Sequence, residues 1–251
     1  MTEERAARHV VGVNPTTELL SSGCPVDRLY VEEHRSGPQI RRLTAMAKER
    51  GIPVIHTTKA YLDRVSEGAV HQGVAAVAAE KEYCSVDDIL QYAAQRGEPP
   101  FLLILSEIMD PHNLGAIIRS AEGCGAHGII VPARRSAPLS SVVAKTSAGA
   151  LEHMRIARVT NLAAAIDGLK KAASGYTARR TAAPPLYTDT DLRGPLALVI
   201  GNEGAGIGKL VREKCDGLVR IPMVGSVSSL NASVAAGVLL YEALRQRNLR
   251  T

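Results

Sequence analysis

The second half of the chain contains a series of short runs that are apolar over nearly their whole length, and these constrain the fold most. An alternating strand is covered on one face, whereas an unbroken apolar strand is covered on both, as in parallel sheets flanked by helices. Helical stretches separate the runs, so we predict an α/β fold with a mainly parallel sheet. The predicted strands are Phe101–Leu105, Gly128–Val131, Arg155–Val159, Leu196–Ile200 and Gly217–Ile221.

The N-terminal part predicts a second, smaller α/β unit, because short apolar strands alternate there with a helical pattern. Ile40, Leu43 and Ala47 follow one another at the spacing of a buried helix face. The strands predicted for this unit are Leu29–Val31, Ile52–Ile55 and Val74–Val77.

A polar and charged stretch separates the two parts. We interpret residues 80–100 as a linker that carries a short helix at about Val86–Ala94. The predicted domains are therefore 1–79 and 101–251, and a chain of 251 residues is long enough to bury a core in each.

The positive net charge of the chain is compatible with a polyanionic partner but is not sufficient evidence for one. The formal net charge is +5, and many proteins with such a charge never bind nucleic acid. The chain has no Trp, one Phe and seven Tyr, so it offers few flat rings on which splayed bases could stack. If RNA is the partner, we expect contacts to its backbone and shape to dominate.

Neither a metal site nor a membrane anchor is predicted. Cys24, Cys84, Cys124 and Cys215 lie far apart without a C-x-x-C pair, so we expect free, buried thiols, and the seven His residues form no ligand cluster. No run approaches the roughly 20 apolar residues of a membrane span, and the start of the chain lacks the apolar core of a secretory signal. We therefore predict a cytoplasmic protein.

Two glycine patterns resemble nucleotide-binding motifs without their context. Gly123–Gly128 matches G-x-G-x-x-G, but a helix precedes it and a strand follows, which is the reverse of a dinucleotide-binding site and indicates a tight turn. Gly201–Lys209 follows a predicted strand, but Glu203 and Leu210 replace residues that a P-loop needs. This second loop is either a plain turn or a close backbone contact for a small polar ligand.

The segment after Phe101–Leu105 predicts a helix with its own start signal. Asp110-Pro111 is typical of a helix start, and Leu114, Ile117, Ile118 and Ala121 then follow at the spacing of a buried face. Arg119 and Glu122 lie three residues apart on another side. They form either a surface ion pair or part of an active site.

Three separated segments, in this order and spacing, closely resemble the motifs of the SpoU/TrmH family of RNA 2'-O-ribose methyltransferases, which belongs to the SPOUT class. They are Asn113–Arg119 with Glu122, Ile200–Gly206, and Ile221–Asn231. Lys145–Ala150 and the N-terminal stretch ending at Val74 are also similar to the family's pattern. The resemblance therefore covers nearly the whole chain.

This resemblance implies a fold and a methyl donor. The family's catalytic domain contains a trefoil knot, which spacing alone would never predict. Its small N-terminal domain resembles the ribosomal L30e fold and would grip RNA. The donor is S-adenosylmethionine, and the residues that would contact it, largely through their backbone, are Gly201, Ile221 and Leu230.

The catalytic residues that the resemblance implies are Asn113, Arg119, Glu122, Glu203, Ser229 and Asn231. Arg119 matches the family's catalytic arginine, yet a guanidinium normally stays protonated, so we favour phosphate binding or stabilisation of a developing alkoxide. The proton of the hydroxyl leaves to Glu203, to water or to a transiently neutral Arg119, and the sequence does not decide among these. Ser229 and Asn231 are also good caps for a helix over Val234–Leu244.

Among the subgroups, the chain looks most like the bacterial methyltransferases that modify a guanosine in 23S rRNA. The alternatives within the enzyme class are an rRNA adenosine methyltransferase of the antibiotic-resistance type and a tRNA methyltransferase. Outside that class, the alternative is an RNA-binding protein of ribosome assembly. The family builds its site beside a subunit interface, so we also expect a homodimer.

Overall fold

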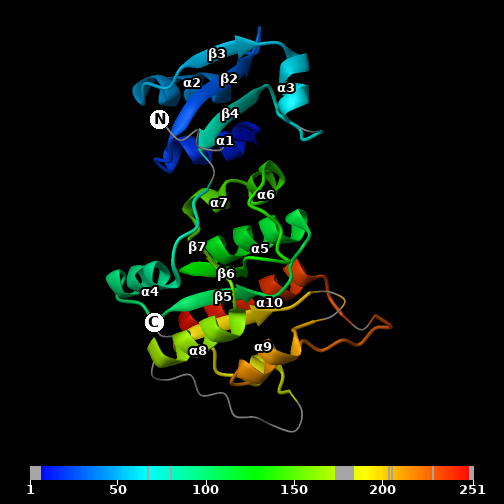
Figure 1. Ribbon diagram of the computed structural model, residues 1–251. Helices are drawn as coiled ribbons and strands as arrows, with labels where there is room; N and C mark the ends of the chain where they lie inside the picture. Colours follow the sequence, from blue (N-terminus) through cyan, green and yellow to red (C-terminus); the bar gives the residue numbers. More distant parts are fainter. Residues whose placement is uncertain are drawn as a thin grey trace. The chain divides into compact units, whose positions relative to one another are not determined.

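The computed structural model describes residues 7–66, 68–79, 81–172, 184–202, 204, 206–227 and 229–248. Contacts divide the chain into two compact units, both drawn in Figure 1. Unit 1 comprises the residues up to Glu82 together with Pro138–His153, and unit 2 comprises Tyr83–Ala137 and Met154 onward. No helix of the described part is both long and apolar enough to cross a membrane.

Unit 1 contains a 4-stranded sheet in the order β1-β4-β2-β3. β4 runs antiparallel to β1 and β2, whereas β2 and β3 are parallel. The strands are β1 (Ala7–Val11), β2 (Val26–Glu32), β3 (Val54–Thr57) and β4 (Val74–Ala79). The helices are α1 (Val13–Ser21), α2 (Pro38–Glu49), α3 (Lys59–Val65), α6 (Ser141–Thr146) and α7 (Ala150–His153).

The larger core of unit 1 lies between its sheet and the helices α1 and α2. Leu19 of α1 and Leu43 of α2 are fully buried there against Leu29 of β2. α3 covers part of the other face through Leu62, which packs with residues of β1 and β4. These elements confirm the small N-terminal α/β unit and its predicted helix.

Unit 2 contains a 4-stranded sheet in the order β7-β6-β5-β8, and every pair in it is parallel. The predicted mainly parallel sheet is therefore confirmed. The strands are β5 (Phe101–Leu105), β6 (Gly128–Pro132), β7 (Ile156–Val159) and β8 (Leu196–Ile200). The helices are α4 (Val86–Gln95), α5 (Pro111–Gly123), α8 (Leu162–Ala172), the 3-10 helix η1 (Tyr187–Asp189), α9 (Lys209–Lys214) and α10 (Ala232–Asn248).

The strand order of unit 2 creates a natural place for a ligand. The chain passes from β5 outward to β6 and β7, and then returns to place β8 on the other side of β5. α4, α8 and α9 pack in one core cluster on one face of the sheet, while α5 packs against α10 (Figure 1). Open parallel sheets bind ligands where the strand order reverses, outside the carboxyl ends of the strands. In unit 2 this point lies between β5 and β8.

Gly217–Ile221 does not form the fifth strand that its apolar run predicted. This segment makes a single bridge, between Arg220 and Leu186. The backbone of Arg220 donates to the carbonyl of Pro185 at 2.9 Å and accepts from the amide of Tyr187 at 3.1 Å. One bridged residue satisfies too few backbone groups to add a strand to the sheet, so this part of the prediction is wrong.

Most of the predicted linker belongs to unit 2. The predicted helix is present as α4, and Ser85 and Asp88 form a capping box at its start. Ile89 of α4 is fully buried in the core with Leu102 of β5, because the helix turns its apolar face to the sheet. Residues from Tyr83 onward are therefore part of a packed domain.

A segment from the second half of the sequence packs in unit 1. α6 and α7 lie within Pro138–His153, and they bury Val143 and Leu151 completely. The His153 ring nitrogen lies 3.0 Å from a carboxylate oxygen of Glu18 in α1. Such pairing between residues far apart in sequence has no local signal.

Candidate active site

α5 begins at the carboxyl end of β5 with the predicted start signal. The Asp110 carboxylate accepts a hydrogen bond from the amide of His112 at 2.9 Å, and Pro111 occupies the first helical position. Leu114 and Ile117 are fully buried. This anchoring holds Asn113 in the first turn of α5, beside the point where the strand order reverses.

Asn231 uses both ends of its side-chain amide. Its oxygen caps α10 by accepting from the amides of Ser233 at 2.9 Å and Val234 at 3.3 Å. Its nitrogen donates to the side-chain oxygen of Asn113 at 2.9 Å, although the two residues lie 118 positions apart. The structure thus joins the first and third predicted motifs and confirms the cap on α10.

The loop after β8 is a closed turn that requires its first glycine. Asn202 and Gly206 exchange backbone hydrogen bonds of 3.1 and 2.9 Å. A Cβ atom on Gly201 would lie 2.4 Å from the carbonyl carbon of Gly206, so no other residue fits without a shift of the loop. α9 then starts at Lys209 after Gly208, outside this turn. The arrangement presents backbone groups at the carboxyl end of β8 and is not a P-loop.

Three residues that were not among the predicted site residues connect the loops at this edge of the sheet. The side-chain nitrogen of Asn202 donates to the carbonyl of Glu107 at 3.1 Å. The carboxylate of Glu107 accepts from Arg135 at 2.9 Å. These residues closely follow β8, β5 and β6, and that position after parallel strands is the signal that could have identified them.

Two protein-family models match this chain, one in its N-terminal part and one in its C-terminal part. Residues 100–241 match the SpoU rRNA Methylase family, and residues 9–84 match a family described as RNA 2'-O ribose methyltransferase substrate binding. The chain belongs to the SpoU rRNA methylase family. It is therefore an RNA methyltransferase, and the resemblance of its three motifs is confirmed at the level of the family.

Relatives and solved structures support the membership along the whole chain. YacO of Bacillus subtilis, named for the TrmH family of tRNA/rRNA methyltransferases, is 45% identical over 96% of this chain and 96% of its own length. AviRb of Streptomyces viridochromogenes, a SpoU methyltransferase solved with AdoMet, has a TM-score of 0.79 at 30% identity and covers 96% of this chain and 90% of its own. An AdoMet-bound rRNA methyltransferase of Sinorhizobium meliloti has a TM-score of 0.78 at 26% identity, over 97% and 88%.

The other predicted site residues that the structure describes on α5 and before α10 are exposed or half-buried in this SpoU chain. Arg119 and Glu122 lie exposed on α5, and among the described residues Arg119 forms neither a hydrogen bond nor an ion pair. The predicted alternative of a surface pair with Glu122 is therefore not observed. Ser229 is exposed, whereas the donor-contact candidates Ile221 and Leu230 are half-buried. Glu203 lies outside the described residues.

The first glycine pattern and the buried thiol have structural roles in the SpoU domain. Gly125 turns the chain with a φ of 72° after α5 ends, so the predicted turn is confirmed. All four cysteines are free, but Cys124 alone is fully buried. Burial raises the pKa of the Cys124 thiol to about 11, which keeps it protonated at neutral pH and unsuited to act as a nucleophile. No cluster of three or more potential metal ligands occurs among the described residues.

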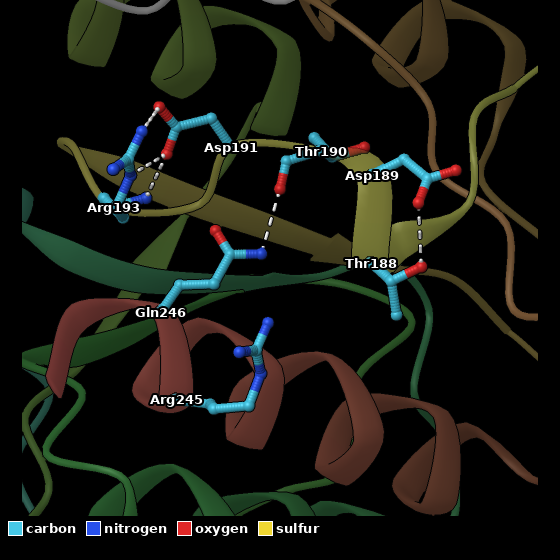
Figure 2. A pocket seen from close by; sticks show the side chains of 7 residues that line it. All are labelled: Thr188, Asp189, Thr190, Asp191, Arg193, Arg245 and Gln246. Carbon is cyan, nitrogen blue, oxygen red and sulfur yellow. Dashed lines mark hydrogen bonds and ion pairs between the residues drawn. The ribbon is translucent and has the colours of Figure 1, made fainter. Parts of the chain in front are cut away.

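A pocket of about 320 Å³ lies near the end of α10, away from the motif residues. Figure 2 shows the side chains that line it and the hydrogen bonds among them. Gln246 lies 15 residues after Asn231 on one helix, which corresponds to roughly 22 Å. Arg193 pairs with Asp191 and Arg245 pairs with Glu242, so both guanidinium groups that line this pocket already have a carboxylate partner. This pocket is therefore separate from the edge between β5 and β8, where the motif residues lie.

Proposed function

We propose that the protein transfers a methyl group from S-adenosylmethionine to the ribose 2'-hydroxyl of a guanosine in 23S rRNA. The observation that carries this proposal is the hydrogen bond between Asn113 and Asn231 at the point where the strand order reverses. It brings two of the family's motifs together where parallel sheets bind ligands. When bound, S-adenosylmethionine supplies a methyl group on an electron-poor sulfonium.

The residues at this edge fit such a donor. The closed turn after Gly201 offers backbone groups to a polar ligand, and the half-buried Ile221 and Leu230 offer apolar contacts. We therefore assign donor binding to Gly201, Ile221 and Leu230. The trefoil knot that the resemblance implies around this site remains a prediction.

Arg119 is the cation that we assign to the target nucleotide. A guanidinium is a planar cation with several N–H donors, so Arg119 is suited to bind a phosphate or stabilise a developing alkoxide. Its exposure and its lack of a partner among the described residues leave its donors available for RNA. Asn113 and Glu122 orient the nucleotide, and the hydroxyl proton leaves to Glu203, to water or to a transiently neutral Arg119.

Ser229 and Asn231 hold the loop that leads into α10. Asn231 fixes the start of this helix and contacts Asn113 at the same time. Ser229 lies two residues earlier, exposed at the same end of the helix. We propose that both residues position the bound nucleotide and the donor relative to each other.

The length of the matches favours rRNA over tRNA as the substrate. The rRNA methyltransferase of Sinorhizobium meliloti aligns with 97% of this chain, including unit 1. A TrmH/SpoU tRNA modifying enzyme of A. aeolicus aligns with 61% of it, at a TM-score of 0.54 and 26% identity. We assign the grip on RNA to the N-terminal domain, over the predicted residues 1–79, and catalysis to residues 101–251.

We propose that the active protein is a homodimer. Val234 and Tyr241 lie seven residues apart on α10, which places them on one side of the helix, and they are 51% and 54% exposed. Exposed apolar residues aligned on one helix are typical of an interface. A second copy packed there would also bring groups toward Arg119, which has no partner in its own described chain.

The decisive assay measures transfer of labelled methyl groups from S-adenosylmethionine to 23S rRNA that lacks its native modifications. We expect incorporation at one guanosine, located by mass spectrometry as a 2'-O-methyl group. Arg119→Ala should lower the rate at least 100-fold while donor binding and the unfolding temperature stay close to wild type, because the exposed side chain supports no packing.

Other outcomes separate the alternatives. Methylation of an adenosine or of tRNA would replace the guanosine assignment and keep the enzyme class. Tight RNA binding without donor binding in calorimetry would identify an RNA-binding protein of ribosome assembly. Full activity of the Arg119→Ala variant would remove Arg119 from the mechanism.

A further inference from the structure

We propose that Arg135 binds a phosphate of the RNA beside the target nucleotide, and that Glu107 competes with this phosphate for the same guanidinium. The inference rests on the proposed function in that it takes RNA as the substrate. It adds a phosphate subsite to the edge of the sheet that carries the site. The residues involved lie in the arginine loop, which we define as Ala133–Ala137.

The arginine loop is fixed at both ends. The amide of Ala133 donates to the carbonyl of Val159 at the end of β7, at 2.8 Å. The amide of Ala137 donates to the carbonyl of Ile108 after β5, at 2.9 Å. The loop therefore crosses the carboxyl ends of the strands in a set position, next to the residues that lead into α5. A group held in place before a ligand arrives loses less entropy on binding.

Glu107 and Arg135 both adopt left-handed backbone conformations that are uncommon for residues other than glycine. Their φ angles are 61° and 58°. Each costs free energy and persists only where the surroundings impose it. Asn202 imposes it in part, since its side chain holds the carbonyl of Glu107 at 3.1 Å. Backbone strain of this kind is concentrated at ligand-binding sites. Here the two strained residues carry opposite charges, and their side chains contact each other.

The ion pair leaves most of the guanidinium available. One nitrogen of Arg135 contacts one oxygen of Glu107 at 2.9 Å, and the Arg135 side chain is 75% exposed. An exposed pair of this kind contributes little to stability, so a phosphate can replace the carboxylate at small cost. A planar guanidinium binds phosphate through two parallel hydrogen bonds. Arg134 is also exposed and adds a second positive charge.

A second arginine–glutamate pair lies at the opposite end of the strands of the same sheet. Arg96 and Glu98 form an exposed ion pair at 2.8 Å shortly before β5 begins, with side chains that are 47% and 42% exposed. It places an arginine–glutamate pair at the amino ends of the strands, where the site is absent, although Arg96 also donates to Tyr92 and Glu98 also contacts His127. Arg96→Ala is therefore the control for Arg135→Ala.

The first test measures binding of unmodified 23S rRNA transcript to the full-length protein, without S-adenosylmethionine. Arg135→Ala should weaken binding about 10-fold and reduce the slope of log K against log salt by about one, as expected for one lost phosphate contact. Arg96→Ala should change neither quantity. In the methylation assay, Arg135→Ala should raise the KM for RNA and leave kcat within about twofold.

The second test separates a phosphate subsite from a structural pair, because the two roles predict opposite signs. Glu107→Gln removes the competing charge, so RNA binding should become tighter and its salt slope should not decrease. If the ion pair only shaped the loop, Glu107→Gln and Arg135→Ala would weaken binding alike, and the inference would be overturned. Thermal unfolding of each variant within about 2 °C of wild type shows that the fold is intact.

These experiments distinguish failure of the phosphate subsite from failure of the proposed methyl-transfer reaction. Loss of RNA binding in Arg135→Ala without methyl transfer in the wild type would keep the subsite and reject the reaction. Methyl transfer by the wild type with wild-type RNA binding and salt slope in Arg135→Ala would keep the reaction and reject the subsite.

Discussion

The side-chain oxygen and nitrogen of Asn231 have different roles, one in helix capping and one at the candidate site. The oxygen caps α10, and the nitrogen reaches Asn113 in α5. Sequence reasoning predicted the cap from residue type and the catalytic role from resemblance, but the contact between the two helices required the structure. A local pattern contains no information about which helix start lies beside another.

Two substitutions separate these roles at the residue scale. Asn231→Asp keeps an oxygen acceptor for the cap and loses the nitrogen donor to Asn113, so we expect wild-type stability with strongly reduced methyl transfer. Asn231→Ala loses both and should cost about 1 kcal/mol in the free energy of unfolding. Denaturant unfolding and the methylation assay check the two effects.

Ser85→Ala is the matched control, because it removes the cap of α4, which lies outside the site. It should cost a similar free energy of unfolding and leave methyl transfer intact. Wild-type activity in Asn231→Asp would show that the contact with Asn113 plays no part in the reaction.

Gly201 carries a second prediction at this scale. Its Cβ would lie 2.4 Å from the carbonyl carbon of Gly206, so Gly201→Ala must displace the turn after β8. We expect a loss of S-adenosylmethionine binding of at least 10-fold in calorimetry, because the displaced backbone is the proposed donor contact.

Gly208→Ala provides the comparison, since a Cβ there meets nothing within 4 Å. Its donor affinity should equal that of the wild type. Equal affinity in both variants would place the donor away from Gly201.

At the scale of elements, α4 shows why a polar stretch was interpreted as a linker. The stretch is charged overall, yet Ile89 and Ala93 form a narrow apolar stripe that is fully buried. Two such residues are too few for composition to reveal a core helix, although the capping signal and the helix itself were predictable. The strand predicted at Gly217–Ile221 is not formed, because an apolar run does not determine whether a neighbouring strand is available for pairing.

The packing of α4 against β6 gives a prediction at this scale. A Cβ on Gly128 would lie 2.6 Å from the Cδ1 atom of Ile89, so Gly128→Ala should destabilise by about 1–3 kcal/mol through overpacking. Ile89→Ala should cost about 2–5 kcal/mol because it leaves a cavity. Chemical denaturation of each variant measures both values.

The double variant provides the decisive comparison. With Ile89→Ala the space beside Gly128 is open, so adding Gly128→Ala should cost little or restore stability. Simple addition of the two single effects would show that α4 does not contact β6 in solution.

At the scale of the whole molecule, the proposed homodimer yields the last prediction. Tyr241→Glu places a charge on the exposed apolar side of α10 and should convert a dimer into a monomer, with loss of methyl transfer. Light scattering after size exclusion measures the mass. Leu210→Glu alters an equally exposed residue of α9, at 56% exposure, and should leave the dimer intact. A wild-type protein that is monomeric at working concentration would contradict the proposal.

The sequence by itself determined the class of fold, the start and buried face of α5, the cap on α10 and the family. These depend on local periodicity, on short-range hydrogen-bond chemistry and on the order of motifs, all of which are written along the chain. Only the tertiary structure decided that α4 belongs to the core of unit 2 and that Pro138–His153 packs in unit 1. It alone joined Asn113 to Asn231 and Glu107 to Arg135, because contacts between distant segments follow from strand order and packing.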